Sequence, residues 1–180
     1  CFDNATSCSS ENAVIVVDAV YDDCVVALQR AGGMLLDAAQ TKHLIDTHWH
    51  EGHLNRNMLA QDIDAVLRTL GMTDTAPQNT KFLVAPASGI GPDHPVSGEK
   101  MALFLALYRA NGFADAKAKA RAIHDYQGRG HSLGLHSRDD QRAHELAMEM
   151  QACRIIVNQA HCFATGGSFD NGLPFSLSMG

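Results

Sequence analysis

The sequence predicts an α/β fold, a three-layer α/β/α arrangement around a mostly parallel sheet. Short, continuous apolar runs rich in β-branched residues, such as 12–19 and 153–160, have the pattern of strands that are covered on both faces. These runs alternate with segments of helical length and amphipathic character. Alternating strands and helices are typical of α/β units with right-handed crossovers.

Each expected element follows from its local pattern. The expected strands are, in chain order, 12–19, 81–87, 100–110, 132–137 and 153–160. The expected helices are 21–33, 36–50, 57–72, 113–128 and 138–152. Residues 100–110 also suit a helix, since Met, Ala and Leu are good helix formers.

Glycine and proline set several expected ends. Gly32 and Gly33 are expected to stop the first helix, Gly71 to end the third, and Pro86 to stop the second strand. In the helix over 113–128, the apolar side is expected to carry Ala118, Ala122 and Ile123. Ligands of parallel sheets collect at the carboxyl ends of strands, so the Gly- and Pro-rich loops 89–99 and 158–174 are the candidate site walls.

Length, charge and cysteine content restrict the classes of protein. The 180 residues form one expected domain, and the 14 basic residues are scattered, which argues against nucleic acid as a partner. No apolar run is long enough to indicate a membrane span. The five cysteines include no CxxC pair, so neither a disulfide framework nor a zinc ribbon is indicated, and a cytoplasmic location is expected.

A histidine-rich stretch, HWHEGH at 48–53, resembles a metal motif only superficially. A zincin needs HExxH, which places two histidines at i and i+4 on one helix face. Here His50 and His53 are one residue too close for that pattern. We therefore expect solvated or packing histidines and no resident metal.

Cys8 is the candidate nucleophile, because it lies among small polar residues directly before a predicted buried strand. A thiol becomes a good nucleophile where backbone N–H groups or a helix N-terminus stabilise its anion. An isolated cysteine in any sequence can equally be an inert, buried, small apolar residue. The residues around Cys8 leave both readings open.

The segment FDNATSCSSENAVIVVD resembles the nucleophile segment of the aldehyde dehydrogenase superfamily, specifically its CoA-acylating branch, in which TFDNGTxCxSEQxV is the usual form. Three more stretches match this branch in order. They are SGEKMALFLALYRANGF (like EKLSPVLAxYR), YQGRGHSLGLHS (like GxGHTxxIHS) and ACRIIVNQAHCFATGGSFDNGLPFSLSMG (like CRIxVNxPSSxGGxGxxYNxxLxPSLTLG). The match extends over nearly the whole chain, although residues 33–78 contribute little.

The resemblance implies a role for three residues. Cys8 matches the catalytic thiol, which would attack an aldehyde to give a thiohemiacetal; hydride transfer to NAD or NADP would leave a thioester that coenzyme A removes. Glu99 matches the cofactor-binding glutamate that holds the ribose hydroxyls. His131 matches a histidine of the acylating branch, which we assign to proton transfer or to placement of coenzyme A.

The sequence departs from the family pattern at two places. MALF replaces LSPV after Glu99, and AHCFATGG replaces PSSQGG, which brings His161 and Cys162 to a loop expected to bind the substrate. This form resembles acylating enzymes for sulfoacetaldehyde and related short anionic aldehydes. His161 is the candidate cation for such an anion, and a packing role is its alternative.

The resemblance implies that residues 1–180 are a single catalytic domain of the aldehyde dehydrogenase fold. The N-terminal dinucleotide-binding domain and a C-terminal oligomerisation strand are expected to lie outside it, so the chain alone is expected to turn over little. The intact protein is expected to be a homo-oligomer that acts on a small aldehyde and coenzyme A. A hydrolytic aldehyde dehydrogenase and a non-catalytic α/β binding or assembly module remain the alternatives.

Overall fold

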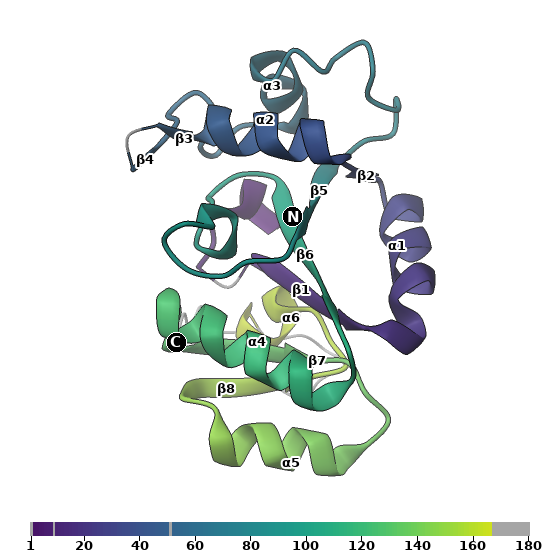
Figure 1. Ribbon diagram of the computed structural model, residues 1–180, viewed down its shortest axis with the longest axis vertical. Helices are drawn as coiled ribbons and strands as arrows, with labels where there is room; N and C mark the ends of the chain where they lie inside the picture. The colour runs from purple at the N-terminus through teal and green to yellow at the C-terminus, as the bar shows by residue number, and fades with distance from the viewer. Residues whose placement is uncertain (1, 9, 51, 167–180) are drawn as a thin grey trace.

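A four-stranded parallel sheet lies at the centre of the molecule (Figure 1). The structure is a computed structural model and describes residues 2–8, 10–50 and 52–166. The strand order is β1-β6-β5-β2, and every neighbouring pair is parallel. The strands are β1 (Ala13–Val17), β2 (Gly33–Leu35), β5 (Phe82–Ala87) and β6 (Phe104–Ala110).

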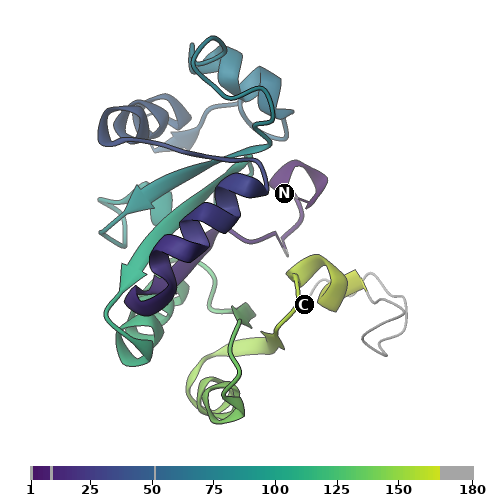
Figure 2. The same cartoon turned by 90° about the vertical axis from the view of Figure 1, so that its right-hand side faces the viewer.

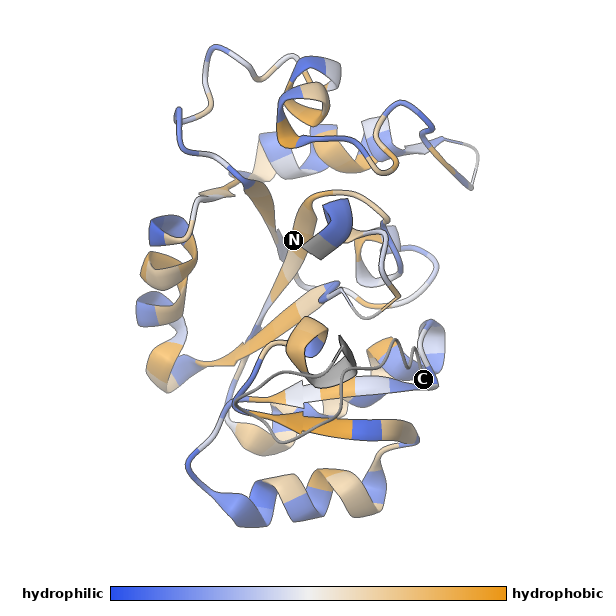
Figure 3. Cartoon of the chain, turned by 180° about the vertical axis from the view of Figure 1, so that it is seen from behind, coloured by the Kyte–Doolittle hydropathy of each residue, from blue (hydrophilic) through white to orange (hydrophobic). Residues whose placement is uncertain are grey.

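Helices cover both faces of this sheet, which confirms the three-layer α/β/α prediction. Successive side chains of a strand point to opposite faces, and in β5 Phe82 and Val84 pack in the cluster that includes α1 (Tyr21–Arg30). Leu83 and Ala85 pack in the cluster on the other face. That face is covered by α2 (Ala38–His48), α3 (Ile63–Thr69) and α4 (Phe113–Tyr126). Figure 2 shows α1 lying along the sheet, and in Figure 3 the central strands are mostly hydrophobic.

A second, two-stranded parallel sheet lies between α4 and α5 (Asp140–Glu149) (Figure 1). It consists of β7 (Gly130–Leu135) and β8 (Ala152–Val157). Its apolar cluster joins Ala120 of α4 to Leu146 of α5, with Leu133 and Ile155 from the two strands and Ile15 from β1. This cluster therefore connects the small sheet to the central one.

The remaining elements are short. They are the 3₁₀ turns η1 (Phe2–Ala5), η2 (Asp18–Val20) and η3 (Pro95–Ser97), the hairpin strands β3 (Trp49–His50) and β4 (His53–Leu54), and α6 (His161–Gly166). Among the described residues, no helix combines the length and the apolar character that crossing a bilayer requires.

Several sequence expectations were wrong in detail. Residues 100–110 form a strand from Phe104, so the helical alternative is excluded, and α3 starts only at Ile63. The buried residue of α4 is Ala120, whereas Ala118 and Ala122 are exposed. The sequence also gave no indication of the short strand β2, which follows directly after the helix stop at Gly32.

Pro86 does not stop β5, because it pairs with Leu107 of β6 inside the strand. Proline lacks the N–H that a central strand would donate. β2 pairs with β5 only as far as Val84. At Pro86, the side of β5 that faces away from β6 therefore has no paired strand in the described part of the chain. The missing N–H faces that side, and the strand can continue to Ala87.

Candidate functional site

Cys8 is exposed and lies in the segment that leads into the amino end of β1. This segment, residues 2–8 and 10–12, is called the Cys8 segment below. The preceding turn, η1, is unusual, because Asp3, Asn4 and Ala5 all have positive φ angles, of 52°, 50° and 60°. Residues other than glycine rarely adopt this left-handed conformation, and it clusters at functional sites where surrounding contacts enforce it. Local contacts therefore have to hold the Cys8 segment in place.

Those contacts come from the turn itself and from the loop before α3. The Asn4 side chain donates to Asp62 Oδ1 (2.9 Å) and to the Ala60 carbonyl (3.2 Å). The Ala60 N–H in turn donates to the Met101 carbonyl (3.0 Å), two residues beyond Glu99. The Cys8 segment is thus linked through Ala60 to the segment that carries Glu99.

Glu99 has an exposed side chain and a fixed backbone. Its N–H donates to the side-chain oxygen of Gln127 (2.8 Å) at the end of α4. Gly98 makes this approach possible, because a Cβ there would lie 2.3 Å from the same Gln127 oxygen. An exposed carboxylate on a fixed backbone suits recognition of the ribose hydroxyls of a dinucleotide.

Glu99 and Cys8 both precede strands, at the amino ends of β6 and β1. The carboxyl-end expectation concerned the loops 89–99 and 158–174, so a site that includes Cys8 and Glu99 would also draw on the amino ends of strands. The loop 89–99 does start at the carboxyl end of β5. The loop then crosses to the other end of the sheet, because the parallel strands β5 and β6 must both start at that end.

Lys100, next to Glu99, is only 1% exposed. Its Nζ donates to the Gly98 carbonyl (2.7 Å), and its own carbonyl accepts from His48 Nε2 (2.8 Å). Burial lowers the pKa of Lys100 to about 7 and also lowers the pKa of His48. Sequence reasoning missed Lys100, because nothing in the SGEK motif shows that this lysine is buried.

His131, at the start of β7, is half-buried. Its Nδ1 accepts from the Ser132 N–H (2.8 Å), so the neutral ring carries its proton on Nε2. That Nε2 is buried and has no hydrogen-bond partner among the described residues. The pKa of the neighbouring His124 is lowered, mainly by burial and secondly by the proximity of His131. A buried N–H donor without a partner is costly, and a substrate or cofactor oxygen would satisfy it.

His161, at the start of α6, contacts the Cys8 segment. Glu11 Oε1 accepts from the His161 N–H (3.0 Å) and lies 3.4 Å from His161 Nδ1. The hydrogen bond from the His161 side chain lowers the pKa of Glu11 to about 2. The His161 ring also lies against Gly134 of β7, where a Cβ would be 3.0 Å from its Cε1.

The other cysteines differ in environment. Cys162 is half-buried beside His161, and Cys153 is exposed on β8. Burial raises the pKa of the Cys24 thiol on α1, which makes it a poorer nucleophile. Cys1 and the end of the last matching motif, from residue 167, lie outside the described residues.

The histidine-rich stretch is not one helix, because α2 ends at His48. His48 is fully buried, edge-on to Trp49 (4.6 Å) and Phe104 (5.0 Å) between ring centroids. His50 and His53 are exposed and face each other across the β3–β4 hairpin. In the described part of the chain, no three His, Cys, Asp or Glu residues are grouped to hold a metal ion.

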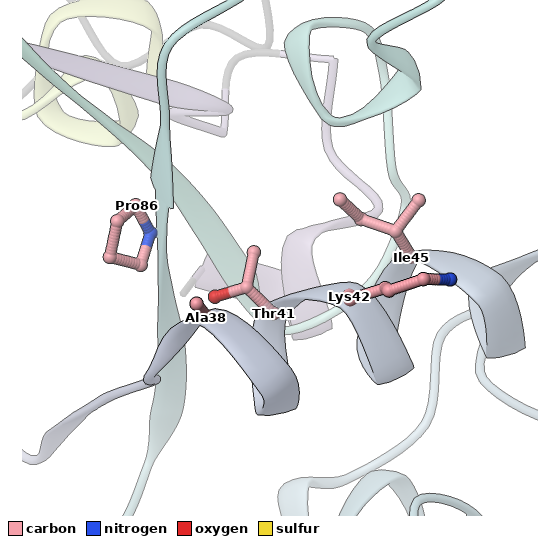
Figure 4. A pocket seen from close by; sticks show the side chains of 5 residues that line it. All are labelled: Ala38, Thr41, Lys42, Ile45 and Pro86. Atoms are coloured by element: carbon pink, nitrogen blue, oxygen red, sulfur yellow. The ribbon is translucent and has the colours of Figure 1, made fainter.

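Two shallow hollows on the surface contain none of the candidate residues. One, of about 370 Å³, lies between α2 and β5 (Figure 4) and is lined by Ala38, Thr41, Lys42, Ile45 and Pro86. The other, of about 470 Å³, is lined by Asp46, Thr47, His50, His53, Leu54 and Asn55. Neither hollow includes Cys8, Glu99, His131, His161 or Cys162.

Two contacts connect segments that carry the candidate residues. Glu11 joins the Cys8 segment to His161 and hence to β7, and Gln127 joins Glu99 to the loop that leads to His131. The first link includes the ring of His161 itself, and the second runs through the backbone N–H of Glu99.

Comparison with known proteins shows what the chain is similar to. Sulfoacetaldehyde dehydrogenase (acylating) of Cupriavidus necator is 46% identical over 179 residues, which are 99% of this chain and 36% of that protein. The chain is therefore similar to part of an acylating aldehyde dehydrogenase. It spans just over a third of the length of this relative. No protein-family model matches the chain.

Solved acylating aldehyde dehydrogenases share the fold. An acetylating aldehyde dehydrogenase from Geobacillus thermoglucosidasius has a TM-score of 0.85 and 27% identity, covering 90% of this chain and 35% of that one. An engineered glycolyl-CoA reductase with bound NADP+ has the same TM-score, 0.85, at 21% identity, covering 99% of this chain and 39% of that one. The family resemblance seen in the sequence is thereby confirmed.

Proposed function

We propose that this chain is the thiol-bearing catalytic domain of a CoA-acylating, NAD(P)-dependent aldehyde dehydrogenase. The observation that carries the proposal is the 46% identity to an acylating enzyme over 99% of the chain. Because the chain spans just over a third of that relative, the activity belongs to a longer enzyme. The dinucleotide-binding domain and the oligomerisation strand are assigned to its remainder.

Cys8 would begin the reaction. Its thiolate adds to the aldehyde carbonyl carbon, and the carbonyl oxygen becomes the oxyanion of a thiohemiacetal. Collapse of the oxyanion expels hydride and leaves a thioester on Cys8, and the nicotinamide supplies the acceptor for that hydride. The thiolate of coenzyme A would then attack the thioester carbon, and the bond from that carbon to the Cys8 sulfur would break, so that Cys8 returns as a thiolate. The exposure of Cys8 supports this role, since an attacking sulfur must be reachable.

Glu99 and His131 would serve the two co-substrates. The exposed Glu99 carboxylate, on a backbone held by Gln127, would accept hydrogen bonds from the ribose hydroxyls of the dinucleotide. His131 has a buried Nε2 without a hydrogen-bond partner among the described residues, so it is placed to donate to a reacting oxygen or to coenzyme A.

We assign a short aldehyde as the substrate and rank sulfoacetaldehyde first, because the Cupriavidus relative acts on it by name. His161 and Cys162 are the proposed wall of the aldehyde site, since Glu11 ties this loop to the Cys8 segment. The Glu11 carboxylate already lies 3.4 Å from His161 Nδ1, which weakens the idea that His161 alone holds a sulfonate.

The setting of the enzyme completes the proposal. We infer a homo-oligomer in the cytoplasm, acting on small molecules and not on nucleic acid or a membrane. The four described cysteines, Cys8, Cys24, Cys153 and Cys162, are thiols, which suits a reducing compartment.

The test uses the full-length enzyme that contains this chain. Reduced nicotinamide and acyl-CoA are measured for sulfoacetaldehyde, acetaldehyde, propionaldehyde and succinate semialdehyde, each with and without coenzyme A. We expect sustained turnover only with coenzyme A, loss of nearly all turnover in Cys8→Ser, and little change in Cys153→Ser. Equal turnover without coenzyme A would indicate the hydrolytic alternative, and full activity of Cys8→Ser would exclude the proposed nucleophile.

A further inference from the structure

We propose that Glu11 and His161 are positioning residues, whose contact fixes the β7–β8 sheet, and with it His131, against the Cys8 segment. The inference rests on the proposed function, because it concerns the acyl transfer from Cys8 to coenzyme A. His161 belongs to a stretch in which this chain departs from the family pattern. The residue pair is therefore a feature of this sequence.

The contact joins two segments 150 residues apart through a single carboxylate oxygen. Glu11 Oε1 accepts from the His161 backbone N–H (3.0 Å) and faces the ring Nδ1 (3.4 Å). The side chains are 33% and 16% exposed, so the pair is sheltered compared with a surface ion pair. Sheltered pairs are screened less by salt and lose more when one partner is removed.

The other side of the His161 ring rests on β7. A Cβ on Gly134 would lie 3.0 Å from ring Cε1 and 3.3 Å from Nε2, so glycine leaves the room that the ring occupies. Gly134 is three residues beyond His131 on the same strand. A shift of the His161 ring would therefore be transmitted along β7 to His131.

The two strands are tied to each other by several hydrogen bonds. Gly134 pairs with Ile156 of β8, and the Asn158 side chain bonds the backbone of Ser137 twice, accepting from its N–H (2.9 Å) and donating to its carbonyl (2.8 Å). Asn158 has a φ angle of 56°, so its conformation is held by these contacts. His161 follows three residues later, and its anchoring by Glu11 thus acts on both strands.

The Cys8 segment has anchors of its own. Ser10 N–H donates to the Ser7 carbonyl (2.8 Å), and Asn4 bonds Asp62 (2.9 Å). Loss of the Glu11 carboxylate should consequently displace the β7–β8 sheet and leave Cys8 in place. The step that needs Cys8 and Glu99 should then survive, while the step that needs His131 should slow.

The experiment separates these two steps in the full-length enzyme. The burst of reduced nicotinamide without coenzyme A reports attack and hydride transfer, and steady-state turnover with coenzyme A reports acyl transfer. For Glu11→Gln and His161→Gln we expect a burst rate within about twofold of wild type and turnover lowered about 10- to 100-fold, because small misplacements cost that much. The KM for coenzyme A should rise as well.

Three comparisons complete the design. The double variant should be no worse than either single variant, because each single variant already removes the contact between the Glu11 carboxylate and the His161 ring. Gly134→Ala, which displaces the ring and keeps both polar partners, should lower turnover in the same selective way. Asp46→Asn, which removes an exposed carboxylate paired with Lys42 on α2, is the control and should match wild type.

The inference is overturned if burst and turnover fall equally, if the single effects add in the double variant, or if all variants behave like wild type. If Glu11→Gln does not fold, Gly134→Ala decides by the same criterion. A wild-type enzyme that gives no burst and no turnover dependent on coenzyme A contradicts the proposed function itself, which is a different result.

Discussion

The side-chain oxygen of Gln127 accepts a hydrogen bond from the backbone N–H of Glu99 at 2.8 Å. This bond connects the end of α4 to the loop between β5 and β6, and Gln127 lies four residues before His131. The side chain of Gln127 thus links Glu99, proposed for the dinucleotide, to the segment that carries His131, proposed for acyl transfer. The link exists because Gly98 has no Cβ to occupy the place of the Gln127 oxygen.

Gly98→Ala should therefore weaken cofactor binding more than folding. The new Cβ would meet Gln127 Oε1 at 2.3 Å, and the exposed Gln127 can swing away only by giving up its bond to Glu99. One hydrogen bond is worth about 1 kcal/mol, so we expect the KM for the dinucleotide to rise about fivefold. Steady-state kinetics of Gly98→Ala and Gln127→Ala, with exposed Gln78→Ala as the control, measure it. Unchanged KM values in both variants would refute the link.

Lys100 should make stability rise with pH above neutrality. Burial lowers its pKa from 10.5 to about 7 in the folded chain, so between these values the unfolded chain binds more protons. The free energy of unfolding therefore rises as the pH is raised from about 7 toward 10.5. Relative to Lys100→Met, wild type should gain up to about 1.4 kcal/mol of unfolding free energy per pH unit. Urea unfolding of both proteins at about pH 7, 8 and 9 tests this, and parallel curves would contradict it.

The fold was predictable because a strand buried on both faces leaves a continuous apolar run. The run 12–19 and its counterparts in β5 and β6 indicated the central parallel sheet correctly, whereas the run in β8 belongs to the separate two-stranded parallel sheet. The strand β2 was missed because it has only three residues, Gly33–Leu35, directly after a helix stop. Pro86 misled the prediction, since an open strand edge depends on where β2 ends and is invisible in sequence.

The site was predictable only in part. Motifs pointed to Cys8, Glu99 and His131, and their proposed roles await the experiments above. The Glu11–His161 contact could not be predicted, because its partners are 150 residues apart and each has an ordinary local sequence. Lys100 escaped notice for a related reason, since its burial arises from packing beneath the loop and not from its neighbours in the chain.

Glu11 should make the protein sensitive to acid. The His161 side chain, by its hydrogen bond, lowers the pKa of Glu11 from 4.5 to about 2, so this stabilisation is complete above pH 4.5 and is lost as the pH falls toward 2. Glu11 is partly exposed, and solvent screening reduces the effect to about 1 kcal/mol. Urea unfolding across this range should show a smaller acid loss in Glu11→Gln than in wild type. An equal loss in both proteins would contradict the assignment.

Thiol labelling separates an activated Cys8 from one that is merely exposed. Cys153 is also exposed but lies on β8, away from the nucleophile segment, so it is a matched internal control. Burial raises the pKa of Cys24, which should therefore react slowest of the three. With iodoacetamide near pH 7, we expect Cys8 to be alkylated about tenfold faster than Cys153, since a stabilised thiolate is the reactive species. Peptide mass spectrometry over a time course gives each rate, and equal rates at Cys8 and Cys153 would favour a non-catalytic module in which Cys8 is only a surface thiol.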